Sequence, residues 1–148
     1  MHIAIGSDHA GFSLKQEIID LLEELGHSYQ DFGVYDQAPS DYPDVGKEVA
    51  QAVARGDFDR GILICGSGIG MDITANKVHG IRAALCHDTF TAHSSREHND
   101  ANILCMGGRV VGRGLARDIV AVWLASEFTG AERHRRRIDK ISALEASR

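Results

Sequence analysis

A cysteine followed by three evenly spaced glycines is the part of this sequence best suited to chemistry. Cys65 ends the apolar run 62–64 and precedes Gly66, Gly68 and Gly70. A continuous aliphatic run is typical of a buried parallel strand, and glycines beyond it allow several backbone N–H groups to face one anion. Cys65 would then lie beside a reacting carbon of the bound anion. The alternative is that it is a small core residue, as many cysteines at strand ends are.

A basic cluster near the C-terminus is the second candidate for ligand binding. Residues 133–137 read Arg-His-Arg-Arg-Arg, and Arg133 and Arg137 would share one side of a helix. Two arginines so placed can hold a phosphate through charge-assisted hydrogen bonds. The alternative is a solvated helix face. Because the net charge is −5 and this is the one local basic cluster, we expect no nucleic-acid partner.

Length and composition predict one globular domain covering residues 1–148. The chain is 43% hydrophobic and 25% charged, and no apolar run approaches the roughly 20 residues of a membrane helix, so we expect no membrane partner. The N-terminus lacks the pattern of a secretory signal, which favours a cytoplasmic location. The three cysteines form no short-spaced pair, which is typical of reduced thiols in such a compartment.

Short apolar runs alternate with segments of helical spacing along the chain, which predicts repeated βα units and a parallel sheet. The expected strands are 3–6, 28–32, 62–65, 82–86 and 102–106. The expected helices are 12–25, 41–55, the segment from the glycine loop to about 77, 114–126 and 132–144. The pattern indicates an α/β fold with a doubly wound, Rossmann- or flavodoxin-like sheet of five parallel strands and helices on both faces.

Doubly wound sheets bind ligands beyond the carboxyl ends of their strands, near a switch in strand order. Polar segments adjoin several expected strands, and we expect all of them to meet at that edge. These segments are 7–11, 65–70, 87–88, 96–100 and 107–109.

Common cofactor motifs do not fit the sequence. The glycine-rich turn follows the third expected strand, no G-x-G-x-x-G opens the first βα unit, and no Gly-Lys-Ser/Thr follows the loop. His87, His93 and His98 lie near several carboxylates, but their spacing matches no tight ligand motif. We therefore expect neither a cofactor nor a metal.

Several motifs, in order, resemble one known family over nearly the whole chain. They are G-S-D-H-A-G-F-S-L-K at 6–15, D-Y-P at 41–43, C-G-S-G-I-G at 65–70, A-N-K at 75–77, G-I-R at 80–82, H-N-D-A-N at 98–102 and G-G-R-V-V-G at 107–112. This set is similar to the sugar-phosphate isomerases of the ribose-5-phosphate isomerase B and galactose-6-phosphate isomerase family.

The resemblance implies aldose–ketose isomerisation of a sugar phosphate, with ribose 5-phosphate to ribulose 5-phosphate expected first. Such a reaction moves a proton between C1 and C2 through an enediolate and needs one base and oxyanion donors. By resemblance Cys65 is that base, and Ser67 replaces a common threonine whose hydroxyl bonds the thiolate or a substrate oxygen. Some relatives instead use a glutamate at the position of Met71, next to Asp72.

The resemblance also assigns the other site residues. His98 opens the sugar ring, Asp8 orients the substrate or assists ring opening, and Asn99 donates to an enediolate oxygen. From the residues alone, His98 could be a surface histidine at a helix end and Asp8 a helix cap. The expected phosphate-holding residues, beside the glycine loop, are His9, Arg109, Arg133, His134 and Arg137.

The family places its active site between two subunits, which implies a homodimer or a dimer of dimers. The expected C-terminal helix, about 131–148, has Ile138, Ile141 and Leu144 on one stripe, suited to packing on a partner subunit or, alternatively, within the chain. Three other readings stay open: isomerisation of allose 6-phosphate, galactose 6-phosphate or a tetrose phosphate, a binding module for a phosphorylated metabolite, and a metal-dependent enzyme of pyrimidines or sugar acids.

Overall fold

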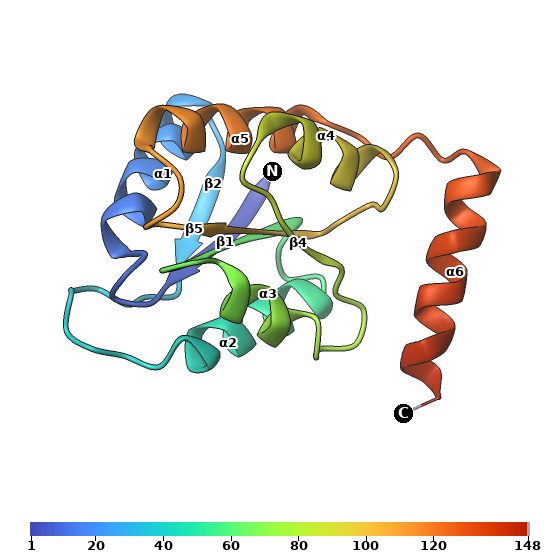
Figure 1. Ribbon diagram of the computed structural model, residues 1–148, viewed down its shortest axis with the longest axis horizontal. Coiled ribbons are helices and arrows are strands. Elements are labelled where there is room, and N and C mark those ends of the chain that lie inside the picture. The colour runs from blue at the N-terminus through green and yellow to red at the C-terminus, as the bar shows by residue number, and fades with distance from the viewer. Residues whose placement is uncertain (148) are drawn as a thin grey trace.

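The computed structural model describes residues 1–147 and has the expected parallel sheet at its centre (Figure 1). All neighbouring strands are parallel, in the order β2-β1-β3-β5-β4. The strands are β1 (His2–Ser7), β2 (Ser28–Asp31), β3 (Arg60–Cys65), β4 (Ala83–Leu85) and β5 (Ile103–Gly107). The predicted fold class is confirmed.

Helices cover both faces of the sheet (Figure 1). One face carries α1 (Phe12–Glu24), α4 (Thr89–Glu97) and α5 (Arg113–Ala125), and the other carries α2 (Tyr42–Ala54) and α3 (Ile69–Ala75). Successive side chains of a strand point to opposite faces, so Ile62 and Ile64 of β3 pack toward α1 and α5, whereas Leu63 and Cys65 pack toward α2 and α3. A strand with helices on both sides must be apolar throughout, and every residue of β3 is buried.

Helix α4 was not among the expected elements. Its sequence, TFTAHSSRE, has no apolar stripe, and its buried residues are Ala92, Ser95 and Arg96. The helix is instead defined by polar contacts at its ends. Asp88 caps its start, because the side chain accepts a hydrogen bond from the Thr91 backbone N–H at 2.7 Å.

The last helix, α6 (Glu132–Ala146), stands beside the body of the domain, joined to it by the segment after α5 (Figure 1). His134 is the one buried residue of this helix. Ile141 and Leu144 are 45% and 65% exposed, so the stripe predicted for this helix is uncovered over its second half. Among residues 1–147, no helix has the length and apolar character needed to cross a membrane.

Candidate functional site

A cleft lies where β1 and β3 end side by side, at the point where the strand order changes direction. Its volume is about 540 Å³. Segments after β1, β3 and β5 form its walls, together with the start of α2 and α3. The lining residues are Asp8, His9, Ala10, Tyr42, Cys65, Gly66, Ser67, Ile69, Gly70, Ile73, Arg109 and Val110. We call this site the Cys65 cleft.

Cys65 is the last residue of β3, and its buried side chain reaches the base of the cleft. Its Sγ accepts a hydrogen bond from the Gly68 backbone N–H at 3.2 Å. The loop therefore places a hydrogen-bond donor against the sulfur. The Ser67 Oγ accepts from the Ile69 N–H at 3.2 Å, and its own proton is left for another acceptor.

The shape of this loop depends on Gly68, whose φ is +79°. A Cβ at this position would lie 2.5 Å from Leu85 Cδ1 and 2.7 Å from the Met106 carbonyl carbon. Only glycine both adopts this backbone angle freely and allows the loop to lie against β5. The loop can therefore turn its Gly68 N–H back onto Cys65.

Asp8 and His9 follow β1 and form a second wall of the cleft. The Asp8 Oδ1 accepts from the Gly11 N–H at 3.0 Å in the turn before α1; Gly11, and not Asp8, is the N-cap of that helix. His9 forms a reciprocal pair with Ser40: its N–H donates to Ser40 Oγ, and its Nδ1 accepts from the Ser40 N–H, both at 3.2 Å. Because Nδ1 is an acceptor, a neutral His9 carries its hydrogen on Nε2.

Arg109 and Tyr42 complete the cleft. The Arg109 N–H donates to the Gly66 carbonyl at 3.0 Å, and its guanidinium lies beside Gly66. The Tyr42 ring packs so closely on Gly70 that a Cβ there would lie 2.5 Å from it. Ser40 was not among the expected site residues, although it directly precedes the D-Y-P motif that contains Tyr42.

Five of the expected site residues lie elsewhere: His98, Asn99, Arg133, His134 and Arg137. His98, Asn99 and the segment before β5 lie at the amino edge of the sheet, where Arg60, the first residue of β3, and Arg96 both donate to the Ser126 carbonyl. At about 3.3 Å per residue, the two ends of β3 are roughly 16 Å apart. The expectation that all polar segments share one edge is therefore wrong within one chain, because a segment preceding a parallel strand lies at the opposite edge from one following it.

A second group of candidate site residues gathers at that amino edge. The rings of His98 and His134 stack, with centroids 4.3 Å apart and an interplanar angle of 13°. His98 Nε2 lies 3.4 Å from Glu97 Oε2, and Arg133 and Arg137 extend from the same helix as His134. We call these five residues, His98, His134, Glu97, Arg133 and Arg137, the His98 cluster.

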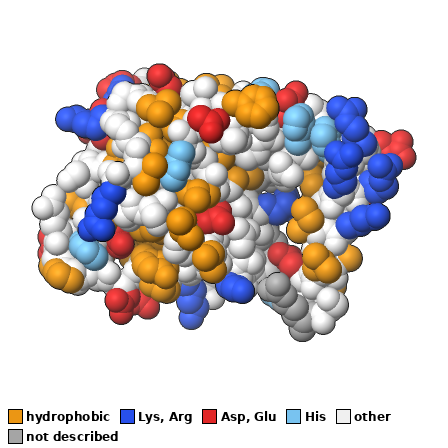
Figure 2. Space-filling model, in the orientation of Figure 1, with side chains coloured by type: hydrophobic (Ala, Val, Ile, Leu, Met, Phe, Trp, Pro, Cys, Tyr) orange, Lys and Arg blue, Asp and Glu red, His pale blue; other side chains and the backbone are white. Residues whose placement is uncertain are grey.

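The His98 cluster carries excess positive charge. Figure 2 shows Lys and Arg side chains gathered over α6, with histidines between that helix and the body. The pKa of His134 lies below its ordinary value, chiefly because of burial and then because of His98, Arg133 and Arg137. The buried Nε2 of His134 has no hydrogen-bond partner among residues 1–147.

Burial affects Asp72 and Cys105, two titratable groups outside the cleft and the cluster. The pKa of Asp72 is raised by burial, and its Oδ1 is buried without a partner among residues 1–147. Burial also raises the pKa of the Cys105 thiol well above its ordinary value, which keeps that group protonated. Within the described residues, no group of three or more His, Cys, Asp or Glu side chains is placed to hold a metal ion.

Fold and cleft together define an α/β protein with a cleft beside a buried cysteine at the point where the strand order changes. A family model described as Ribose/Galactose Isomerase matches residues 3–141. Ribose-5-phosphate isomerase B of Escherichia coli is 48% identical over 99% of this chain and 97% of its own. D-erythrulose-4-phosphate isomerase of Pectobacterium atrosepticum is 47% identical over 88% of this chain and 86% of its own.

A solved structure of Clostridium thermocellum ribose-5-phosphate isomerase B is 54% identical, covers 99% of each chain and superposes with a TM-score of 0.97. The protein therefore belongs to the ribose/galactose isomerase family, as the sequence motifs predicted, and is a sugar-phosphate isomerase.

Proposed function

We propose that this protein interconverts ribose 5-phosphate and ribulose 5-phosphate, with Cys65 moving the proton between C1 and C2 through an enediolate. The observation that carries the proposal is the Gly68 N–H aimed at Cys65 Sγ at the base of an anion-sized cleft. That contact holds a hydrogen-bond donor against the sulfur, which is the atom that would take up the proton.

The Cys65 cleft supplies part of the remaining chemistry. His9 offers Nε2–H and Arg109 offers its guanidinium, and both are suited to phosphate oxygens. Asp8 lies beside them to orient the sugar hydroxyls. The Ser67 hydroxyl donates to an oxygen of the substrate, since its own oxygen already accepts from Ile69.

The Cys65 cleft does not contain His98, to which the resemblance assigns ring opening, and the His98 cluster supplies that group. We place the complete site between two copies of the chain, where the cleft of one copy meets His98, Asn99, Arg133, His134 and Arg137 of the other. The exposed Ile141 and Leu144 support this arrangement, because docking onto a second copy would bury them. The two edges of one sheet cannot meet, whereas edges of two copies can.

We assign the substrate from the chemistry of the site and from similarity to relatives. The chain is nearly equally identical to a pentose-phosphate isomerase and to a tetrose-phosphate isomerase, so a second substrate is almost as well supported. The alternative is a four-carbon sugar phosphate. Tyr42 narrows the cleft against Gly70, so the space around this ring selects chain length.

The test is an isomerisation assay with the purified, metal-free protein on ribose 5-phosphate and on tetrose and hexose phosphates. We expect the pentose to give the highest kcat/KM. A higher value with a tetrose phosphate would keep the reaction and change the substrate, and no turnover of any sugar would leave only a binding role. Run in D2O, the reaction should place solvent deuterium on C1 of the ketose; a product free of deuterium would contradict the exchangeable enediolate.

A further inference from the structure

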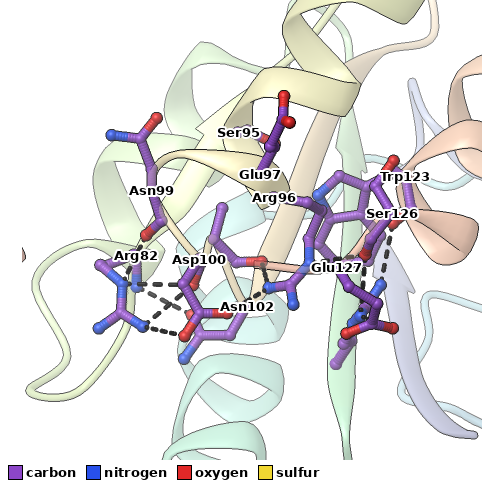
Figure 3. Close-up of polar contacts among 12 residues, drawn as sticks. Arg82, Ser95, Arg96, Glu97, Asn99, Asp100, Asn102, Trp123, Ser126 and Glu127 are labelled. Carbon is purple, nitrogen blue, oxygen red and sulfur yellow. Dashed lines mark hydrogen bonds and ion pairs between the residues drawn. The ribbon is translucent and has the colours of Figure 1, made fainter. Parts of the chain in front are cut away.

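Asp100 lies at the centre of the polar contacts drawn in Figure 3, directly after His98 and Asn99. Its Oδ1 forms an ion pair with Arg96 Nη1 at 2.9 Å, and its Oδ2 accepts a hydrogen bond from Arg82 Nη2 at 3.3 Å. The Arg96 side chain is 7% exposed. A buried guanidinium needs a nearby counter-charge, and the Asp100 carboxylate is shared between two of them.

The backbone at Asp100 is also unusual. Its φ is +48°, a left-handed value that no other residue except glycine adopts within residues 1–147. Aspartate and asparagine tolerate this region better than other side chains. The turn lets the Asp100 N–H donate to the Arg96 carbonyl at 3.1 Å, which satisfies one of the carbonyls left open at the end of α4.

The same two arginines hold the backbone on both sides of Asp100. Arg82 Nε donates to the Asn99 carbonyl at 2.9 Å, and Arg96 Nη1 donates to the Ala101 carbonyl at 2.6 Å. Figure 3 shows the Asn99 amide pointing away from Arg82. The contacts therefore fix the main chain of Asn99 and leave its side chain available to a ligand.

We propose that Asp100 is a positioning residue that, through Arg82 and Arg96, fixes the direction in which Asn99 presents its side chain to the sugar. This rests on the function proposed above for Asn99. With Asp100 neutral, Arg82 and Arg96 lose the counter-charge that they share. A displacement of about 1 Å in a reacting group can lower the rate by about 10²-fold.

The test compares Asp100→Asn with the wild type and with Glu127→Gln. Asparagine retains the tolerance for left-handed φ and removes only the charge. Glu127→Gln is the matched control, since it neutralises an exposed carboxylate that pairs with Arg60 at the same edge. We expect Asp100→Asn to lower kcat/KM on ribose 5-phosphate by roughly 10- to 100-fold and Glu127→Gln to change it by less than about 2-fold.

A double-mutant cycle separates positioning from general destabilisation. If Asp100 acts through Asn99, adding Asp100→Asn to Asn99→Ala should cost less than about 3-fold, because the group it positions is already gone. Fully multiplicative losses would indicate a structural role and overturn the inference. Should Asp100→Asn fail to fold, Arg82→Lys takes its place, since it keeps the charge but loses the fork that reaches Asn99.

The wild-type assay distinguishes the two proposals. An active wild-type protein with an unaffected Asp100→Asn variant would overturn this inference alone. A wild-type protein inactive on every sugar phosphate would overturn the proposed function and this inference together.

Discussion

The Cys65 cleft and the His98 cluster are built in different ways. In the cleft, main-chain groups set the geometry: Gly68 N–H bonds the sulfur, Ser40 N–H bonds His9, and Gly66 carbonyl holds the Arg109 main chain. In the cluster, stacked rings and long charged side chains on α6 set it, and one buried ring nitrogen has no partner among residues 1–147. The difference indicates that main-chain contacts within one chain hold the cleft, whereas under our proposal a second copy would complete the cluster.

Replacing the cysteine tests the Cys65 cleft and should have the largest effect. We expect Cys65→Ala to lower kcat by about 10²- to 10⁴-fold, the usual contribution of a general base, with KM little changed. Cys105→Ala is the control, because burial keeps that thiol protonated and outside the cleft. Steady-state kinetics on ribose 5-phosphate measure both variants. Near-full activity of Cys65→Ala would mean that another group moves the proton.

Mixing two inactive variants tests whether the halves come from different copies. Cys65→Ala and His98→Ala should each be inactive alone. After equal amounts are unfolded and refolded together, about half of the dimers are mixed and each has one intact site, so activity should return to about a quarter of the wild type. No recovery, with mixed dimers present by native mass spectrometry, would place both residues in one chain's site.

Removing one arginine of the His98 cluster should have a smaller effect, and that effect should fall on substrate binding rather than on turnover. We expect Arg137→Ala to raise KM by roughly 10- to 100-fold with kcat little changed, because a hydrogen bond between charged groups contributes about 1.5–3 kcal/mol. Arg136→Ala on the same helix is the control, as that side chain has no assigned ligand. Equal effects of the two variants would indicate general attraction by the basic helix instead of a specific phosphate contact.

The smallest expected effect concerns the stability of the cluster as a function of pH. The pKa of His134 in the folded protein is lowered from 6.5 by burial, while Glu97 opposes and His98, Arg133 and Arg137 reinforce the effect. Below pH 6.5 the unfolded chain therefore takes up a proton first, so stability falls as the pH decreases. Urea denaturation in phosphate-free buffer at pH 7.5 and 5.5 should show a smaller loss for His134→Gln. Equal losses of stability in the wild type and in His134→Gln would show that protonation of His134 does not cause the pH dependence.

Sequence patterns correctly predicted those parts of the molecule whose structure depends on burial alone. The run 62–64 had to be a two-sided strand, and Cys65 had to follow it to the carboxyl edge. Helix α4 was not predicted because it is defined by polar contacts, such as the one between Asp88 and Thr91. Such contacts leave no periodic pattern of apolar residues in the sequence. The place of His98 was misjudged for a reason of direction, since residues before β5 lie at the amino edge. The contact between Ser40 and His9 was not predicted either, because no local sequence pattern determines the path of the loop that brings Ser40 to His9.

The isolated position of α6 has a consequence for how activity varies with protein concentration. If the second copy supplies the ring-opening group, a folded chain by itself has no complete site. Dilution should then reduce the rate per mole of chain, with a midpoint at the dissociation constant of the pair. The apolar residues left open along this helix, Ile141 and Leu144, would set that constant.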